Sequence, residues 1–216
     1  MSKDYNIQVK ADEHYKSKKY DDLSRFISYY YQINEARQLE VENILEIGIG
    51  GGIVAGYLKS IGKQVVTCDF DKDTQADIIS DVRNINVADK SFDLVIACQI
   101  LEHIPFVDLA KGLSEIRRVS KKYAMISLPY RSSYFEMVIK FPFSRTIFKR
   151  DFFDLVVRKS VKFPGFEKSG QHYWEIDQKK YKLADVRAKL EDKFKILYEF
   201  SPVLNKYHYF FILEVK

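Results

Sequence analysis

The sequence has 216 residues, of which 46% are hydrophobic and 30% charged. This length suits one domain with a developed core, and the composition is that of a globular protein. No apolar run reaches the roughly 18 residues that span a bilayer, and the polar start from Met1 to Tyr5 does not have the pattern of a secretory signal. Two cysteines make no disulfide framework. We therefore expect one domain with a cytoplasmic location.

The net charge of +5 is concentrated in one segment. Residues 138–168 carry eight Lys or Arg against three Asp or Glu, an excess equal to that of the whole chain, and aromatic residues interleave with them. This pattern favours binding of an amphiphilic or anionic molecule, or peripheral contact with an anionic membrane surface. A lid helix with one core face and one solvated basic face explains it as well. Nucleic-acid binding is not predicted, because it needs more than this local excess.

The first predicted elements are helical. Asp21 and Asp22 can cap a helix whose apolar positions, from Leu23 to Tyr31, recur at helical spacing. A second helical stretch is expected over Asn34–Leu39, and it leads into the first strand.

Short apolar runs then alternate with amphipathic stretches, which predicts an α/β fold with a parallel sheet and helices on both faces. Strands are expected at Asn43–Ile47, Gln64–Cys68, Asp77–Ser80, Phe92–Ala97 and Tyr123–Leu128, and helices at Ile53–Ile61, Phe106–Val119 and Lys182–Lys193.

Two connections depart from simple alternation. Only residues 70–76 separate the second strand from the third, so the crossover helix is expected to be missing or reduced to a single turn. The last two strands, Phe194–Phe200 and Tyr207–Val215, have a link of a few residues between them, which permits only an antiparallel pair. Residues 129–171 resemble neither pattern and are interpreted as an insertion over one edge of the sheet.

A glycine-rich turn follows the first strand, in the segment Leu45-Glu46-Ile47-Gly48-Ile49-Gly50-Gly51-Gly52. Such a turn lets a ligand lie against bare backbone. The spacing from Gly50 to Ala55 also fits the dinucleotide fingerprint, so the turn alone does not choose between ligands. Glu46 distinguishes between the two kinds of ligand, because a carboxylate at this position suits a cationic amino group and repels a pyrophosphate.

Two further acidic residues end the next strands. Asp69 can accept hydrogen bonds from both ribose hydroxyls, and Asp81 can accept one from the exocyclic amine of a purine. Either residue can instead be a turn former, since Asp favours strand exits. The segment Leu101-Glu102-His103-Ile104-Pro105 follows the fourth strand.

In these motifs the stretch Val41–Pro129 resembles the class I S-adenosylmethionine-dependent methyltransferases, in particular the type 11 methyltransferase-domain group. The resemblance implies a Rossmann-like three-layer sandwich with a seven-stranded, mostly parallel sheet in the order 3-2-1-4-5-7-6, strand 7 being antiparallel. It also implies one methyltransferase domain over 1–216. Its expected parts are an N-terminal helical lid over 1–40, a cofactor-binding half over 41–128, an acceptor cap over 129–171, and a C-terminal helix with two strands over 172–216.

The resemblance further implies S-adenosylmethionine as cofactor and assigns its contacts. Glu46, Gly48, Gly50 and Gly52 would line the methionine side, and Gln99 would pass near the methionine carboxylate or the sulfonium. Asp69 would hold the ribose and Phe70 would lie beside the adenine, whose edge Asp81 and the backbone of Val82 would read. Cys68 and Cys98 would lie on the two strands that flank the first, about 9–10 Å apart, and so should be free thiols.

Methyl transfer from a sulfonium is an in-line displacement that starts from an activated donor, so alignment and exclusion of water are the main requirements. A general base helps only a protonated acceptor, and His103 and His172 are the weak candidates for it. No metal site is predicted. The expected activity is methyl transfer to a small or amphiphilic acceptor. The alternatives are a non-catalytic module that binds an adenosyl ligand and an NAD(P)-dependent oxidoreductase.

Overall fold

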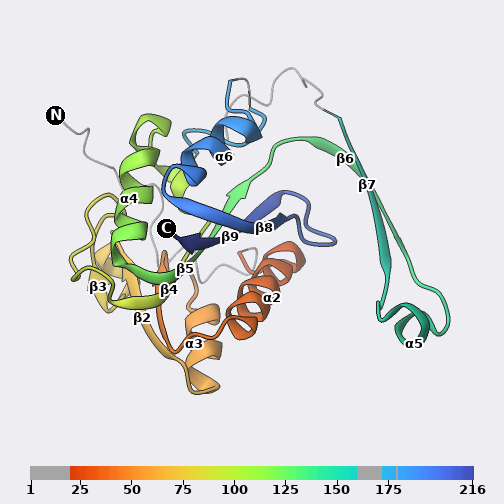
Figure 1. The fold of residues 1–216 in the computed structure, drawn as a ribbon, viewed down its shortest axis with the longest axis horizontal. Helices are drawn as coiled ribbons and strands as arrows, with labels where there is room; N and C mark the ends of the chain where they lie inside the picture. The colour runs from red at the N-terminus through yellow and green to blue at the C-terminus, as the bar shows by residue number, and fades with distance from the viewer. Residues whose placement is uncertain (1–19, 160–171, 179) are drawn as a thin grey trace.

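A seven-stranded sheet forms the centre of the computed structural model, which describes residues 20–159, 172–178 and 180–216 (Figure 1). The strand order is β3-β2-β1-β4-β5-β9-β8. The five strands from β3 to β5 pair in parallel, and β9 runs antiparallel to both of its neighbours. The strands are β1 Asn43–Ile47, β2 Gln64–Asp69, β3 Ile78–Ile79, β4 Phe92–Cys98, β5 Ser120–Pro129, β8 Phe194–Phe200 and β9 His208–Val215.

This architecture confirms the predicted Rossmann-like fold class. The labels differ from the expected 3-2-1-4-5-7-6 only because two further strands, β6 and β7, pair outside the sheet and come before β8 and β9 in the chain. The late antiparallel pair is present as predicted, with Phe194 opposite Val215.

Helices cover both faces of the sheet and make three layers (Figure 1). They are α2 Leu23–Gln38 and α3 Ile53–Ser60 on one face, and α4 Leu109–Val119 and α6 Leu183–Glu191 on the other. Successive side chains of β1 pack on opposite faces of the sheet. Ile44 packs with Ala36 and Leu58, whereas Leu45 packs in the core that contains Leu113. Alternate side chains of a strand point to opposite faces, so both faces of this buried strand are apolar.

Helix α2 differs from the prediction in length. It is one continuous helix, whose N-cap Asp22 accepts a hydrogen bond from the Arg25 amide at 2.8 Å. Of the apolar positions whose spacing predicted this helix, Leu23 and Tyr30 are exposed, at 73% and 62%. The helix instead buries a mostly polar stripe, made of Ser28, Gln32, Glu35 and Ala36. These four recur at helical spacing and face the sheet, where the polar side chains find hydrogen-bond partners.

The shortened crossover is confirmed. A single 3₁₀ turn, η1 Lys72–Thr74, connects β2 to β3. Two more 3₁₀ turns, η2 Leu101–His103 and η3 Phe106–Asp108, connect β4 to α4. Cys68 and Cys98 are free thiols, as predicted.

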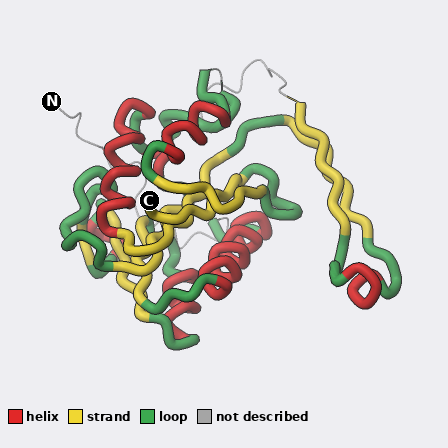
Figure 2. The backbone as a smooth tube through the Cα atoms, in the orientation of Figure 1, coloured by secondary structure: helices red, strands yellow, loops and turns green. Residues whose placement is uncertain are grey.

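The described part of the insertion, up to residue 159, projects from the body instead of lying over the sheet edge, so the prediction was wrong for these residues. Strands β6 Ser133–Ile139 and β7 Phe153–Lys159 pair antiparallel and carry the short helix α5 Ser144–Phe148 at their far end. The three elements, here called the arm (residues 133–159), project away from the three-layer body (Figures 1 and 2). Residues 160–168 of the basic segment lie outside the described residues.

A buried lysine ties the arm to the body. Lys206, in the loop between β8 and β9, is 2% exposed, and its Nζ lies 3.2 Å from Glu136 of β6 and 3.0 Å from Asp154 of β7. Arg158 of β7 donates to the carbonyl of Lys206 at 2.8 Å and to the Ser201 hydroxyl at 2.7 Å. In the described parts of the chain, no helix has both the length and the apolar character needed to span a membrane.

Candidate functional site

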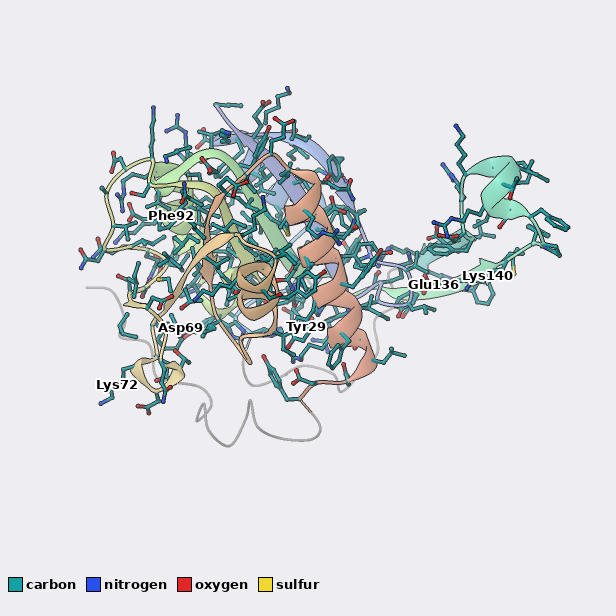
Figure 3. All side chains as sticks on the ribbon, turned by 90° about the horizontal axis from the view of Figure 1, so that it is seen from below. Tyr29, Asp69, Lys72, Phe92, Glu136 and Lys140 are labelled. Atoms are coloured by element: carbon teal, nitrogen blue, oxygen red, sulfur yellow. The ribbon has the colours of Figure 1, made fainter. Side chains whose placement is uncertain are left out.

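A cavity of about 260 Å³ opens at the carboxyl ends of β1, β2 and β4. This is the rim where open α/β sheets bind their ligands. Helix α2 forms the opposite wall, so that Tyr29 of α2 and Asp69 of β2 line the same space, and both are labelled in Figure 3. Residues from the C-terminal part of the chain, His172, Tyr207 and His208, complete the lining.

The glycine turn that follows β1 has the backbone conformation that its sequence requires. Gly48, Gly50 and Gly52 have φ values of +81°, +52° and +74°, in the left-handed region that side chains disfavour. The Gly48 amide donates to the Cys68 carbonyl at 2.8 Å, which holds the turn against the end of β2. Gly48 and Gly50 line the cavity, whereas Gly52 is the N-cap residue of α3 and is not part of the lining.

Glu46 lies inside β1 with its carboxylate in the cavity wall. The residue is 5% exposed, and its Oε2 atom has no hydrogen-bond partner among the described residues. Burial raises the pKa of Glu46 to about 8, although a hydrogen bond from the Ala55 amide and the charge of Lys59 lower it. A buried carboxylate oxygen without a donor is costly, so this position is prepared for a cationic or hydrogen-bonding ligand group.

Asp69 ends β2 and is also buried, at 6% exposure. Its Oδ1 accepts a hydrogen bond from the Asp71 amide at 3.0 Å. Burial raises the pKa of Asp69 against the lowering effect of backbone hydrogen bonds from Asp71, Ile49 and Phe70. The ring of Phe70 is half exposed beside it.

Asp81 is engaged by a neighbour that the sequence analysis did not consider. Arg83 donates to it from Nη2 at 2.7 Å and from Nε at 3.0 Å, and also pairs with Asp108 at 2.9 Å. Burial raises the pKa of Asp81, but the hydrogen bonds and the charge of Arg83 outweigh it, and the net direction is down. The Asp81 carboxylate lines the cavity as an ionised, already paired group.

Most of the predicted cofactor residues gather in this one cavity. The lining contains Glu46, Gly48, Gly50, Asp69, Phe70, Asp81, Val82 and Gln99. Their contacts with a cofactor stay a prediction. The sequence analysis did not assign Tyr20, Arg25 or Gln32 to the site, although all three line it. The polar residues of α2 at helical spacing were the available signal, because a polar stripe on an inward-facing helix indicates a site.

The two candidate histidines also lie in this cavity, side by side. The rings of His103, on η2, and His172 have centroids 4.9 Å apart. A backbone hydrogen bond from Tyr173 to the Glu102 carbonyl, 2.9 Å long, brings the two segments together. The indole of Trp174, fully buried, adds a hydrogen bond to the Ile104 carbonyl at 3.0 Å.

Carboxylates surround His172. Its Nδ1 lies 2.8 Å from Glu175, which also accepts from the Tyr207 hydroxyl at 2.9 Å. Burial lowers the pKa of His172, but the hydrogen bond and charge of Glu175 and the charge of Glu102 raise it by more. The pKa of His172 therefore lies above its ordinary value. The Glu102 side chain is fully buried, and burial raises its pKa to about 8.

Comparisons with known proteins agree with this fold. A family described as a methyltransferase domain matches residues 45–128. A similar solved structure is PH0226 protein from Pyrococcus horikoshii OT3, at 16% identity and a TM-score of 0.56, covering 94% of this chain and 93% of that chain. Another is the N-methyltransferase NodS from Bradyrhizobium japonicum WM9, in complex with S-adenosyl-L-homocysteine, at 10% identity and a TM-score of 0.59, covering 95% of this chain and 96% of that chain.

A third is the 1,6-didemethyltoxoflavin-N1-methyltransferase of Burkholderia thailandensis, at 10% identity and a TM-score of 0.59, covering 91% of this chain and 80% of that chain. Comparison with curated protein sequences gives no match. The sheet order and the crevice at its carboxyl rim define the class I S-adenosylmethionine-dependent methyltransferase fold. The stretch that matches the methyltransferase-domain family, residues 45–128, runs from the third residue of β1 to the end of β5 but for its last residue.

Proposed function

We propose that the protein binds S-adenosylmethionine in this cavity and transfers its methyl group to a small or amphiphilic acceptor by in-line displacement. The observation that carries the proposal is the buried Glu46 carboxylate, whose Oε2 has no donor among the described residues, beside a bare-backbone turn. The ammonium group of a methionine moiety supplies the missing donor and the missing positive charge.

The other contacts follow from the positions of the lining residues. Asp69 would accept hydrogen bonds from the ribose hydroxyls, and Phe70 and Val82 would border the adenine. Asp81 is already paired with Arg83, so the proposal gives its carboxylate a smaller part in reading the adenine than the sequence suggested. When bound, the cofactor supplies a methyl group that its sulfonium has already activated. The chain then has to align the acceptor and exclude water.

His103 and His172 are the candidates for a general base, because both line the cavity. The polar groups around His172 hold its ring in place, so it can accept a proton only at the nitrogen that Glu175 does not occupy. This role is needed only if the acceptor carries its proton until transfer. A cytoplasmic location is part of the proposal.

Ligand binding distinguishes the proposed function from its alternatives. S-adenosylhomocysteine at about a hundredfold excess over its Kd should raise the melting temperature by about 5–10 °C, and NAD or NADP should not. Differential scanning fluorimetry measures both. A shift with NADP or NAD alone would favour an oxidoreductase. Binding of the adenosyl ligand without turnover on a broad panel of acceptors would favour a non-catalytic module.

The arm is the reason for proposing an amphiphilic acceptor. Its tip, residues 140–151, exposes large apolar side chains among four basic residues and a single acidic one. Phe143 is 76% exposed, Ile147 67%, Phe148 57% and Phe141 55%. On one face of the hairpin, Phe135 stands opposite Val157 and Met137 opposite Leu155, all of them exposed. In Figure 3, Glu136 at the base and Lys140 near the tip mark the direction of the arm.

Apolar side chains beside basic ones on a projecting element suit the interface of an anionic bilayer. We therefore propose that the tip of the arm contacts an anionic membrane surface, where an amphiphilic acceptor would lie. The charge of the tip complements acidic lipid headgroups, and a protein or a second copy of the chain is the competing occupant.

Vesicle binding tests the arm. The protein should sediment with vesicles that contain phosphatidylserine and much less with pure phosphatidylcholine. The double variant Phe143→Ser/Ile147→Ser should bind at least about tenfold more weakly, since each side chain loses part of the roughly 1.5–3 kcal/mol that burial provides.

The control for this experiment is Val107→Ser on η3, an 83% exposed apolar residue of the body, which should bind like the wild type. Equal sedimentation of wild type and double variant would contradict the proposal. So would a dimer in solution that the double variant dissolves, because a second copy would then be the occupant.

A further inference from the structure

Two histidines on the wall of the cavity and a fully buried glutamate next to them are arranged as ligands for one cation. We propose that Glu102, His103 and His172 bind a divalent first-row transition metal ion, with zinc as the best match. One nitrogen or oxygen atom from each residue lies within 4.8 Å of the other two. A zinc ion bonds imidazole nitrogen at about 2.1 Å in tetrahedral geometry, so its ligand atoms stand about 3.4 Å apart. Side-chain shifts of less than about 1 Å would close the cluster on an ion.

Glu102 supplies the independent reason to place a cation here. Its side chain is fully buried, and its Oε2 has no hydrogen-bond partner among the described residues. A buried carboxylate oxygen without a partner is expensive, whereas a metal ion neutralises its charge and fills its coordination site. In the amide orientation that satisfies both its oxygen and its nitrogen, Gln99 donates to the other carboxylate oxygen of Glu102, Oε1, at 3.2 Å. This hydrogen bond leaves Oε2 available.

His172 has the support that a metal-binding histidine usually has. Its Nδ1 lies 2.8 Å from the Glu175 carboxylate, which leaves Nε2 to carry the lone pair. This carboxylate–histidine arrangement fixes the tautomer and makes the imidazole a better ligand. Glu175 is held in turn by the Tyr207 hydroxyl at 2.9 Å. The set of two imidazoles and one carboxylate suits zinc or iron better than magnesium or calcium.

The position of the ion refines the proposed function and rests on it. His103 and His172 line the cavity that also holds Glu46 and Asp69, so an ion bound to them would present its open coordination position to that space. With both imidazoles bound to the ion neither would act as a general base, and an acceptor with an oxygen donor would be oriented there by the ion instead. We therefore infer that the acceptor is an oxygen-containing molecule, such as a hydroxyl compound or a carboxylic acid.

Calorimetric titration of the tag-free, metal-stripped protein with zinc sulfate tests the site. The wild type should bind one zinc ion per chain. Glu102→Gln and His172→Ala should each weaken binding at least about tenfold, because each removes a ligand. Cobalt(II) gives a second readout, since a ligand set with imidazole should produce visible absorption bands that both variants lose. Binding of S-adenosylhomocysteine, measured in parallel, reports whether the variants are folded.

His208→Ala is the matched control. His208 lines the same cavity but lies outside the cluster, with its Nδ1 2.9 Å from the Ser28 hydroxyl, so zinc binding should not change. The inference is overturned if the wild type binds no zinc, or if His172→Ala binds it as tightly as the wild type. Intact binding of S-adenosylhomocysteine in that case would leave the proposed function standing. A wild type that binds zinc but no adenosyl ligand would overturn the proposed function and keep the metal site.

Discussion

Replacing Glu46 with glutamine should weaken the binding of S-adenosylhomocysteine about 10- to 100-fold at pH 8. Glutamine keeps the size of the side chain but removes the negative charge that would face the ligand's ammonium group. Hydrogen bonds to charged groups contribute about 1.5–3 kcal/mol, and about 1.4 kcal/mol corresponds to a factor of ten. Isothermal titration calorimetry of both proteins measures the ratio of the dissociation constants.

The same experiment has a pH dependence with a definite sign. Burial raises the pKa of Glu46 to about 8, and Lys59 on α3 and the Cys98 thiol on β4 are the titratable groups that interact with it. Below that pH the ligand-free carboxyl holds a proton that must leave before it can pair with an ammonium group. The affinity of the wild type should therefore rise with pH from 6 to about 8 and then level off. In Glu46→Gln it should stay flat over this range.

The raised pKa also affects the ligand-free protein. The folded state keeps a proton on Glu46 that the unfolded chain releases near its ordinary value of 4.5. The stability that this proton provides is complete below that value and is lost as the pH rises through about 8. Glu35→Gln is the control, because Glu35 is a buried carboxylate of α2 that bonds to Tyr198 and does not line the cavity. An unchanged affinity in Glu46→Gln would place the ligand's amino group elsewhere.

The central sheet could be predicted because its strands are buried on both faces. Asn43–Ile47 and Phe92–Cys98 are mostly apolar, and a glycine turn or a polar segment ends each of them. The carboxyl ends of neighbouring parallel strands meet at one rim, so Glu46 and Asp69 were expected close together. Both line the cavity described above.

The inward face of α2 could not be predicted from hydrophobic periodicity. Apolar spacing selected Leu23, which is exposed, whereas the structure buries Ser28 and Gln32. Ser28 bonds to His208 of β9, a residue far along the chain. The positions of polar residues that face a cavity are determined by their hydrogen bonds and not by burial of apolar surface. The tertiary fold determines which partners they have.

The arm and the Glu102 cluster escaped prediction for related reasons. Strand pattern recognition depends on one buried face, and β6 and β7 expose apolar residues such as Phe135 and Leu155 instead. His172 follows Glu102 at a long distance in the sequence, and only the docking of the segment around Trp174 onto η2 brings the two together. Sequence spacing carries no signal for such a contact.

Alanine substitutions at two glycines should shift stability in opposite directions. In Gly48→Ala the new Cβ would lie 1.9 Å from Cδ1 of Ile100, on a backbone with φ of +81°. The left-handed conformation costs alanine about 1–2 kcal/mol, and displacement of Ile100 adds about 1–3 kcal/mol. The free energy of unfolding, measured by urea denaturation, should fall by about 2–5 kcal/mol.

Gly56→Ala is the matched partner of this change. Gly56 lies inside α3, and a Cβ there would meet nothing within 4 Å. Alanine forms helices better than glycine, so the free energy of unfolding should rise by about 0.5–1 kcal/mol. The contrast separates the turn after β1 from a general effect of adding a methyl group. Equal stability of the two variants would mean that the turn does not need the left-handed backbone on which the proposed cofactor site depends.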